Sequence, residues 1–293
     1  MSNLAIALVI LSSIIHPVWN FLLKKGVNQE IFVWLSLITS SIVLLPLGIV
    51  LQYHYPITLS GWIYILGTIV LHSLYFDFLG RSYLYGNLSL VYPIARGSGS
   101  ALVPILAVLI LGEVVETRAI IGISTVVIGI YTVYLWGSFS QIVKTPLKIL
   151  KTPGTVSAIL TGLTIAAYSL WDKVGVTHVM PFLYMYLMLL GSGLSLSPYI
   201  IYSHGLKAIR KELRTNTPSI ILVGILIYVA YGLILTAFQI SKVSYVSPAR
   251  EMGIVVGVLL GSIILKEPYG TGRLVGSILI VLGVLLITFT GKS

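Results

Sequence analysis

Long runs of apolar residues recur along the whole chain, separated by short polar connections. A helix needs about 20 predominantly apolar residues to cross the hydrocarbon core of a bilayer. The pattern therefore predicts an all-α membrane protein with ten transmembrane helices and no soluble domain. We place the spans at roughly 3–23, 31–51, 61–84, 88–111, 118–136, 154–172, 180–202, 218–240, 243–265 and 272–290.

Two halves of the chain resemble each other when one is shifted by 154 positions. The shift superposes residues that are distinctive in an apolar chain: Arg96 on Arg250, Gly99 on Gly253, Glu113 on Glu267, Gly122 on Gly276 and Gly129 on Gly283. A weaker similarity at a shift of 152 superposes Trp19 on Trp171 and Asn20 on Asp172. Internal duplication is typical of secondary transporters, whose binding site lies between the repeats near the middle of the membrane.

We divide the chain into residues 1–137 and 138–293, with five spans in each half. An odd number of spans per half gives the halves opposite orientations in the membrane, which makes an inverted repeat around a central cavity. Equal orientation would instead require four or six spans per half.

Composition agrees with a membrane location. The chain has 57% hydrophobic and 9% charged residues, and its mean hydropathy is +1.02. The net charge of +10 comes from cations in short connections rather than on a basic domain with stacking aromatics, so we expect anionic lipid headgroups as partners and no nucleic acid. The absence of cysteine excludes disulfides and thiolate metal sites.

The distribution of Lys and Arg predicts the orientation, because cytoplasmic loops collect these residues. Connections after odd-numbered spans hold twelve of them: Lys24, Lys25, Arg81, Lys144, Lys148, Lys151, Lys207, Arg210, Lys211, Arg214, Lys266 and Arg273. The other connections and the C-terminus hold four: Arg118, Lys173, Lys242 and Lys292. The count favours a multi-pass protein of the cytoplasmic membrane with both termini outside. Several of the twelve lie at helix ends, where they can snorkel or face an internal cavity, which weakens the count.

Sequence motifs for catalysis are absent. The chain contains no G-x-S-x-G, H-E-x-x-H or G-x-x-x-x-G-K-[ST] sequence, and no paired aspartates that would hold a metal. We therefore expect no enzymatic activity, no cofactor and no metal.

Spans 4 and 9 combine proline, glycine and a charged residue. Span 4 contains the sequence from Tyr92 to Pro104, with two prolines around Arg96, and span 9 contains Ser247-Pro248-Ala249-Arg250-Glu251-Met252-Gly253. Proline and glycine weaken a helix, so both spans are predicted to be kinked or interrupted. Paired broken helices point to a transport site. The alternative is that the glycines serve close helix packing and the prolines are tolerated kinks.

Arg96 and Arg250 are candidates for anion binding. Each precedes a glutamate by 17 residues, a separation of roughly 25 Å along a helix, so each arginine is deep in the membrane if the glutamates mark an interface. Burying an arginine there costs at least about 2.5 kcal/mol, so the side chain must be paired, hydrated or functional. One alternative is a structural ion pair with Glu251 or Asp77; the other is a guanidinium fork that holds a carboxylate or phosphonate.

Asp77 stands out as an acidic residue well inside an apolar segment, where we expect no other. It shares a helix face with Arg81, four residues later. The two side chains either neutralise each other, or Asp77 carries a proton because desolvation favours the protonated carboxyl.

Four aromatic residues are candidates to shape a pocket: Trp19, Tyr92, Tyr168 and Trp171. The alternative for Trp and Tyr in membrane helices is a position in the interfacial belt.

The chain resembles the EamA-type transporters of the drug/metabolite transporter superfamily. The similarity lies in the segment from Arg81 to Ile94, in Leu111-Gly112-Glu113, in Val246-Ser247-Pro248-Ala249 and in Leu265-Lys266-Glu267-Pro268, with the paired glycines 122, 129, 276 and 283. The resemblance implies a ten-helix basket of two inverted repeats, with spans 1, 3, 4, 6, 8 and 9 around a cavity. It also implies export or exchange of amino acids and other small metabolites, in some members coupled to protons.

Two features depart from the family. Members often place both termini in the cytoplasm, opposite to the charge count here, and an arginine in each broken helix is not general. We therefore expect a carrier for an amino acid-like, zwitterionic or anionic solute, an exporter or exchanger working by alternating access as a monomer or homodimer. Arg96 and Arg250 bind the anion or pair at the gate, with Glu251 and Asp77 as counter-charges. The alternative is an intramembrane enzyme or a scramblase that acts on lipid.

Overall fold

The computed structural model describes residues 1–23, 26–86, 88–136, 151–265 and 270–289. In this part of the chain every regular element is a helix and no strand occurs. The first half forms α1 (Asn3–Leu23), α2 (Gln29–Val43), α3 (Leu45–His54), α4 (Leu59–Tyr85), α5 (Leu88–Leu111) and α6 (Thr117–Leu135), and the second forms α9 (Pro153–His178), α10 (Pro181–Ile240), α11 (Val243–Ala249), α12 (Met252–Leu265) and α13 (Thr271–Thr288).

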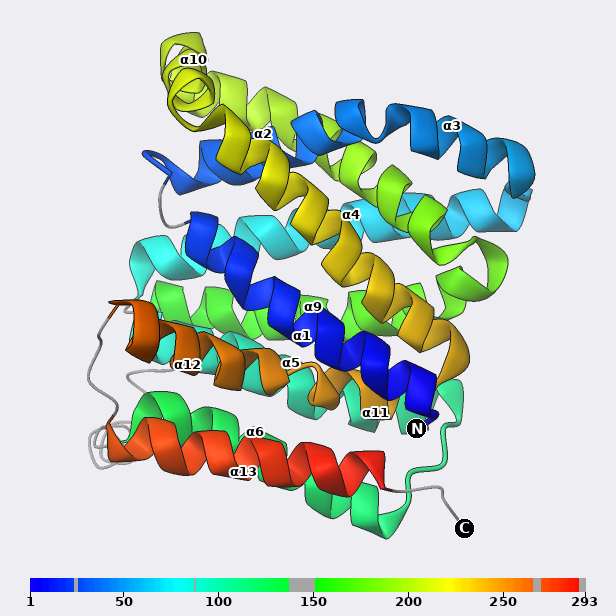
Figure 1. Ribbon diagram of the computed structural model, residues 1–293, viewed down its shortest axis with the longest axis vertical. Coiled ribbons are helices and arrows are strands. Elements are labelled where there is room, and N and C mark those ends of the chain that lie inside the picture. Colours follow the sequence, from blue (N-terminus) through cyan, green and yellow to red (C-terminus); the bar gives the residue numbers. More distant parts are fainter. Residues whose placement is uncertain (24–25, 87, 137–150, 266–269, 290–293) are drawn as a thin grey trace.

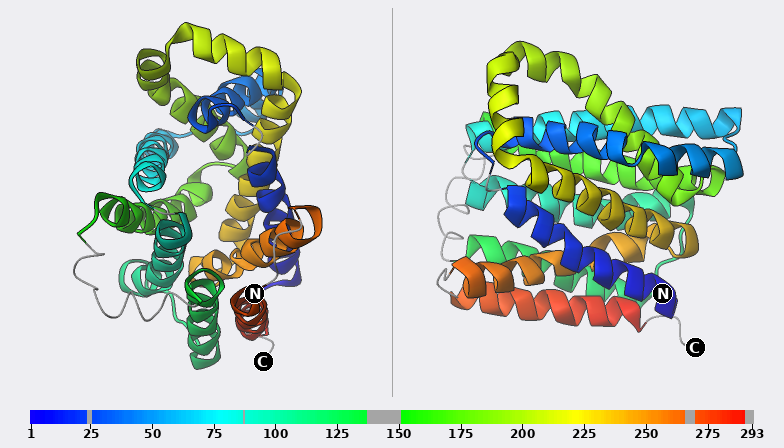
Figure 2. Two further views of the ribbon diagram at one scale, coloured as in Figure 1. Left: turned by 90° about the vertical axis from the view of Figure 1, so that its left-hand side faces the viewer. Right: turned by 45° about the horizontal axis from the view of Figure 1, so that its top comes forward.

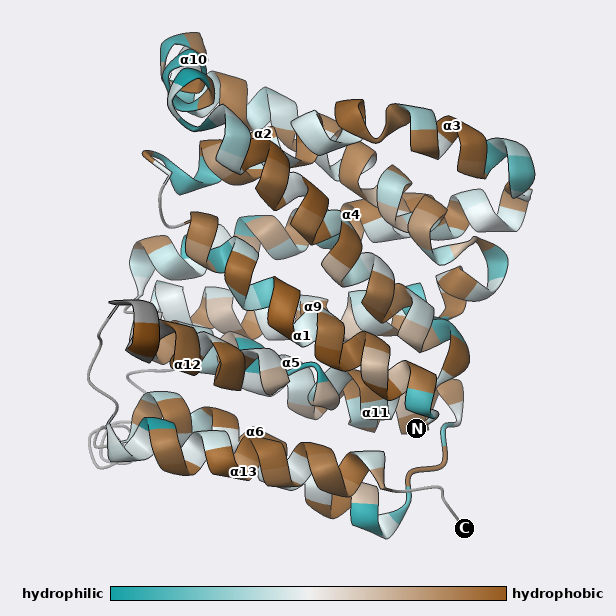
Figure 3. Cartoon of the chain, viewed as in Figure 1, coloured by the Kyte–Doolittle hydropathy of each residue, from teal (hydrophilic) through white to brown (hydrophobic). Residues whose placement is uncertain are grey.

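The helices pack as a bundle in which the long helices are roughly parallel or antiparallel to one another (Figure 1). Seen along the helices, they form a closed arrangement in which α6 and α13 occupy one edge and α2 and α10 the opposite one (Figure 2). Hydrophobic residues dominate the helices (Figure 3), and the large exposed side chains are mostly aliphatic. In the described residues, eight helices are long and apolar enough to cross a membrane, or nine when α2 and α3 count as one bent span. The chain is therefore a helical multi-pass membrane protein.

The structure departs from the predicted spans in two places, and it confirms the predicted interruption of span 9. The predicted span 31–51 is divided at Leu44, where α2 and α3 meet at an angle of 58°. Pro46, in the first turn of α3, explains this break, because proline has no N–H and crowds the preceding turn. The predicted span 243–265 is divided at Arg250–Glu251, between α11 and α12.

The second departure is the predicted connection between 202 and 218, which is helical. It belongs to α10, whose course changes at Gly205, with φ 72° and ψ 157°. Only glycine adopts that backbone conformation readily, since a Cβ would clash. Both predicted spans, 180–202 and 218–240, lie within α10 on either side of this residue.

Span 4, predicted to be kinked or interrupted, is not interrupted. Residues 88–111 form the single helix α5, although Pro93 and Pro104 lie inside it. A membrane helix tolerates proline where neighbouring helices and side chains satisfy the freed backbone groups, and the long contact of α5 with α9 supplies such a neighbour.

Glycines bring α6 and α13 into backbone contact. A Cβ on Gly122 would lie 2.7 Å from the carbonyl oxygen of Gly283, and one on Gly129 would lie 2.8 Å from that of Gly276. The contact is reciprocal, because the same close approaches are found from α13 toward α6. Small residues give helix association in membranes by this kind of close packing.

We expect Gly129→Leu to lower the midpoint of thermal unfolding strongly, because the added side chain must separate two backbones. The matched control is Ile128→Leu, the neighbouring position, whose side chain is 57% exposed on the outside of the bundle. Thermal unfolding of the detergent-solubilised variants measures both. Equal midpoints for the two variants would contradict close α6–α13 packing.

Candidate functional site

An ion pair between the two halves lies inside the bundle. Arg96, from the middle of α5, donates from Nη2 to Glu251 Oε1 at 2.8 Å and from Nε to Oε2 at 3.2 Å. The side chain of Arg96 is 11% exposed and that of Glu251 1%. This bidentate geometry pairs Glu251 with Arg96.

The chain places Glu251 at this position by breaking span 9. Pro248 cannot donate a backbone hydrogen bond, and the turn after it tightens. The N–H groups of Glu251, Gly253 and Ile254 each donate to the carbonyl three residues earlier, at 2.9–3.1 Å. Such i→i−3 bonds are typical of a 3₁₀ turn. Arg250 and Glu251 occupy this turn, and both are buried.

Arg250 has no partner for its charge. It is 6% exposed, its Nε is buried without a hydrogen bond, and in the described residues its guanidinium takes part in no hydrogen bond or ion pair. The backbone of Arg250 is held from α1, where Ser13 Oγ donates to its carbonyl oxygen at 3.3 Å. Two buried guanidinium groups therefore share one carboxylate, and the second is available to an anion.

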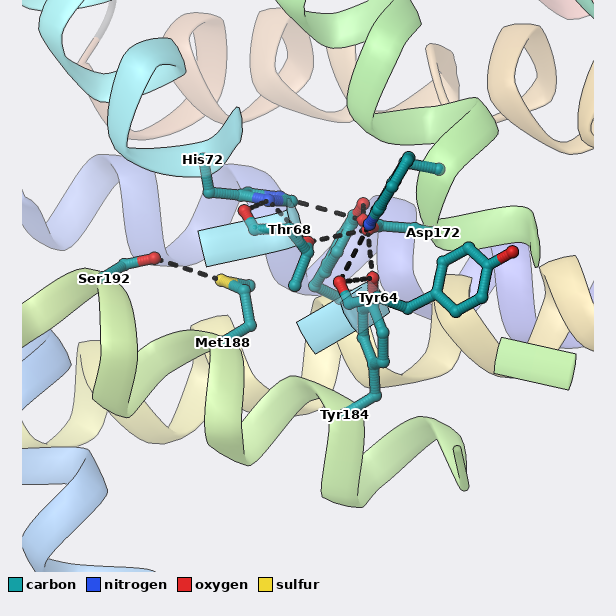
Figure 4. A network of polar contacts seen from close by, with 9 residues as sticks. Tyr64, Thr68, His72, Asp172, Tyr184, Met188 and Ser192 are labelled. Atoms are coloured by element: carbon teal, nitrogen blue, oxygen red, sulfur yellow. Dashed lines mark hydrogen bonds and ion pairs between the residues drawn. The ribbon is translucent and has the colours of Figure 1, made fainter. Parts of the chain in front are cut away.

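A second polar network centres on Asp172 of α9, which is fully buried (Figure 4). Its Oδ1 accepts from Thr68 Oγ1 at 2.6 Å and from the hydroxyl of Tyr184 at 2.8 Å. Its Oδ2 accepts from the hydroxyl of Tyr231 at 2.6 Å and lies 4.0 Å from Nε2 of His72. Helices α4, α9 and α10 thus meet at one carboxylate.

Tyr168 connects the two networks. It is 4% exposed, its ring stacks on His72 at 4.3 Å between centroids, and it lies within electrostatic range of Arg250. Tyr92 is near Arg96 and Glu251 and packs on Tyr134 at 5.2 Å. The structure therefore brings together five of the predicted site residues: Arg96, Arg250, Glu251, Tyr92 and Tyr168.

The two predicted tryptophans have different surroundings. Trp171 donates from Nε1 to the carbonyl oxygen of Tyr64 at 2.8 Å and packs against Gly67, where a Cβ would meet its ring at 2.4 Å. These are the contacts of a residue that joins α9 to α4. Trp19 packs edge-on to His16 at 4.8 Å and against the apolar cluster of α2.

Asp77 is not a counter-charge for either buried arginine. Its Oδ1 accepts from Nε of Arg81 at 3.0 Å, which confirms the shared helix face, and the two side chains are 35% and 60% exposed. An exposed pair of this kind neutralises itself and needs no further partner. The expectation that Asp77 is the only acidic residue well inside an apolar segment is wrong, because Asp172 and Glu251 are both more deeply buried.

Sequence reasoning missed His16, His72, Asp172 and Tyr231 as site residues. One signal was present for Asp172: the shift of 152 superposes it on Asn20, whose amide donates to the carbonyl oxygen of His16 at 2.9 Å. A polar residue at equivalent positions of two apolar spans indicates a candidate site residue.

Four side chains around the arginine pair are partly rather than fully buried: His16, Tyr75, Tyr92 and Arg96. One groove lies between α6 and α13, and another lies beside α4, α5 and α9. Neither is lined by Arg96 or Arg250.

At the end where α1 begins and α13 ends, the halves are joined by polar contacts. Glu113, which follows α5, accepts from the backbone N–H of Val243 at 2.9 Å and of Ser244 at 3.1 Å. Lys242 donates to the carbonyl oxygen of Val114 at 2.7 Å. A carboxylate at a helix N-terminus satisfies unpaired donors and the helix dipole, so Glu113 fixes the start of α11 to the first half.

The fold and the charged interior define a multi-pass helical membrane protein built around buried ionic groups. Residues 152–289 match the model of the EamA-like transporter family. The match covers most of the second half of the chain, and over these residues it confirms the resemblance to the EamA-type transporters of the drug/metabolite transporter superfamily. The motif residues 266–269 lie outside the described residues.

Solved structures share the fold. In total 27 chains match, among them a crystal structure described only as that of a protein, with a TM-score of 0.75 and 14% identity over 99% of each chain. At that identity the likeness concerns the fold alone. No curated protein matches the sequence.

Proposed function

We propose that this chain is a secondary carrier that binds the anionic group of a small zwitterionic or anionic solute at Arg250. The observation that carries the proposal is the buried guanidinium of Arg250, which has no partner among the described residues. A buried unpaired charge is costly and persists in membrane helices where it has a function. Arg96 serves as the gate pair with Glu251, and Tyr92 and Tyr168 border the solute.

Transport proceeds by alternating access between two inverted five-helix repeats. Counting α10 as two spans across Gly205, and α2–α3 as one, brings the nine candidate spans to ten. The glycine contacts between α6 and α13 support a two-fold axis between the repeats. Gly122 contacts Gly283, and their equivalents in the other half, Gly276 and Gly129, contact each other in the same way. The repeat boundary at 137/138 lies outside the described residues.

Access to the site is from the end opposite the termini. The other end is joined by Glu113 and Lys242. With both termini outside the cell, as the Lys and Arg count favours, this is a cytoplasm-facing state of an exporter or exchanger in the cytoplasmic membrane.

The test is counterflow in proteoliposomes with three amino acids of different net charge. We expect accumulation of labelled phenylalanine or glutamate when the same compound is loaded inside, and none of labelled arginine, because two guanidinium groups in the site repel a cation. Lipid flipping or lipid turnover without solute counterflow would favour the alternative of a scramblase or intramembrane enzyme and overturn the proposal.

A further inference from the structure

His72 faces titratable and charged groups from each helix packed around it. Asp172 and Tyr168 approach it from α9, Tyr231 from α10 at 5.5 Å between ring centroids, and Tyr75 from its own helix at 6.5 Å. From the α11–α12 turn, Arg250 lies within electrostatic range. His72 is 5% exposed, so these groups, rather than bulk water, are its surroundings.

Hydrogen bonds fix which nitrogen of His72 carries the proton in the neutral ring. The hydroxyl of Thr68 has one proton, and it donates that proton to Asp172 Oδ1 at 2.6 Å. Nδ1 of His72 lies 3.0 Å from this same hydroxyl oxygen and 3.0 Å from the carbonyl oxygen of Thr68. Both are then acceptors toward the ring, so Nδ1 must be the donor.

The neutral ring therefore presents the lone pair of Nε2 to a carboxylate. The facing atom, Oδ2 of Asp172, is 4.0 Å away and already accepts from Tyr231. Two acceptors that face each other in a buried site repel, and one proton between them converts the repulsion into a charge-assisted hydrogen bond. Nε2 of His72 and Oδ2 of Asp172 therefore form a site that can bind one proton between them, and in the neutral state it holds none.

We propose that the His72–Asp172 pair binds one proton together with each anion that binds at Arg250, so that the carrier moves the anion and the proton in the same direction. The coupling is electrostatic. The unpaired charge of Arg250 opposes a second positive charge on His72, and an anion on Arg250 removes that opposition. Because coupling between two binding sites is reciprocal, the proton must in turn tighten anion binding. The proposal rests on the proposed function, since it requires an anion at Arg250.

The experiment measures protons taken up when purified protein binds benzoate, by titration calorimetry in buffers of different ionisation enthalpy. We expect the uptake to approach one proton per benzoate at neutral to mildly alkaline pH, and the affinity to rise by up to about tenfold per unit fall in pH where uptake is complete. Benzamide, the neutral analogue of the same shape, is expected to cause no uptake.

Two variants identify the site of the proton. His72→Gln is expected to bind benzoate without proton uptake, and Asp172→Asn, which removes the facing carboxylate, to do the same. His54→Gln is the control, because His54 is exposed in the last turn of α3, away from the site; its uptake should match that of the wild type. Since Asp172 joins three helices, its variant is compared only after its thermal unfolding shows a folded protein, and His72→Gln carries the test if Asp172→Asn does not fold.

The outcomes separate the two proposals. Benzoate binding without proton uptake in the wild type, or uptake that survives His72→Gln, overturns the proton site and leaves the anion carrier standing. Absence of benzoate binding together with absence of counterflow overturns the carrier itself, and the coupling with it.

Discussion

Replacing Arg250 with glutamine is expected to reduce the affinity for benzoate by about 100-fold and to abolish counterflow, while the protein stays folded. Arg250 is the buried cation whose guanidinium makes no ion pair in the described chain, so its charge is the one a bound anion neutralises. Loss of one member of a buried charge pair costs on the order of 2–5 kcal/mol, and about 2.7 kcal/mol corresponds to 100-fold in affinity.

The same substitution should raise the stability of the ligand-free protein. Glutamine removes a desolvated charge that nothing balances, so the midpoint of thermal unfolding is expected to rise or stay equal. Arg210→Gln is the matched control, because Arg210 is exposed on α10 and belongs to the basic end of the molecule rather than to the site. Unchanged benzoate affinity in Arg250→Gln, measured by calorimetry, would remove Arg250 from the binding site.

This pattern of higher stability with lost binding separates the functional interpretation of Arg250 from the structural one. A structural arginine loses stability when it is replaced, because its partner is left unpaired. A binding arginine gains stability without the ligand and loses the stabilisation that the ligand confers by mass action. Thermal unfolding with and without benzoate therefore distinguishes the two roles in one experiment.

The sequence predicted the class of fold because membrane spans depend on a local property, the length of an apolar run. It did not predict how each span runs. Span 4 and span 9 carry nearly the same motif, yet α5 continues through Pro93 while the chain turns at Arg250–Glu251. Around the turn the first half has Ile94, Gly97 and Ser98 where the second has Pro248, Glu251 and Met252. Glu251 forms an ion pair with Arg96 of the other half, and such a contact does not follow from the local sequence around either residue.

Site residues were predictable where a charge is rare for its surroundings, as for Arg96, Arg250 and Glu251. His72 and Asp172 were not, because each is unremarkable in its own segment. Asp172 lies near the predicted end of span 6, where an acidic residue indicates the membrane–water interface. In the structure α9 continues to His178, so Asp172 lies inside the bundle. Asp77, predicted to be interior, is partly exposed because the face of α4 that carries it and Arg81 has no covering helix over both side chains.

Glu251→Gln is expected to destabilise the protein more than any other single change considered. Breaking a buried ion pair by removing one partner costs about 3–5 kcal/mol, because the other charge is left uncompensated. Here the loss leaves two uncompensated guanidinium groups, those of Arg96 and Arg250, within electrostatic range of each other. We expect a lower yield of folded protein and a markedly lower midpoint of thermal unfolding in detergent.

Arg96→Gln should cost less than Glu251→Gln, although it breaks the same ion pair. Its loss leaves the carboxylate of Glu251 with Arg250, which lies within electrostatic range and has a free guanidinium. The double variant Arg96→Gln/Glu251→Gln is expected to recover much of the stability lost in Glu251→Gln, since one uncompensated buried cation then remains, as in the wild type. A double-mutant cycle of unfolding midpoints measures this coupling. Equal losses in the two single variants, with no recovery in the double variant, would contradict a site in which two arginines share one carboxylate.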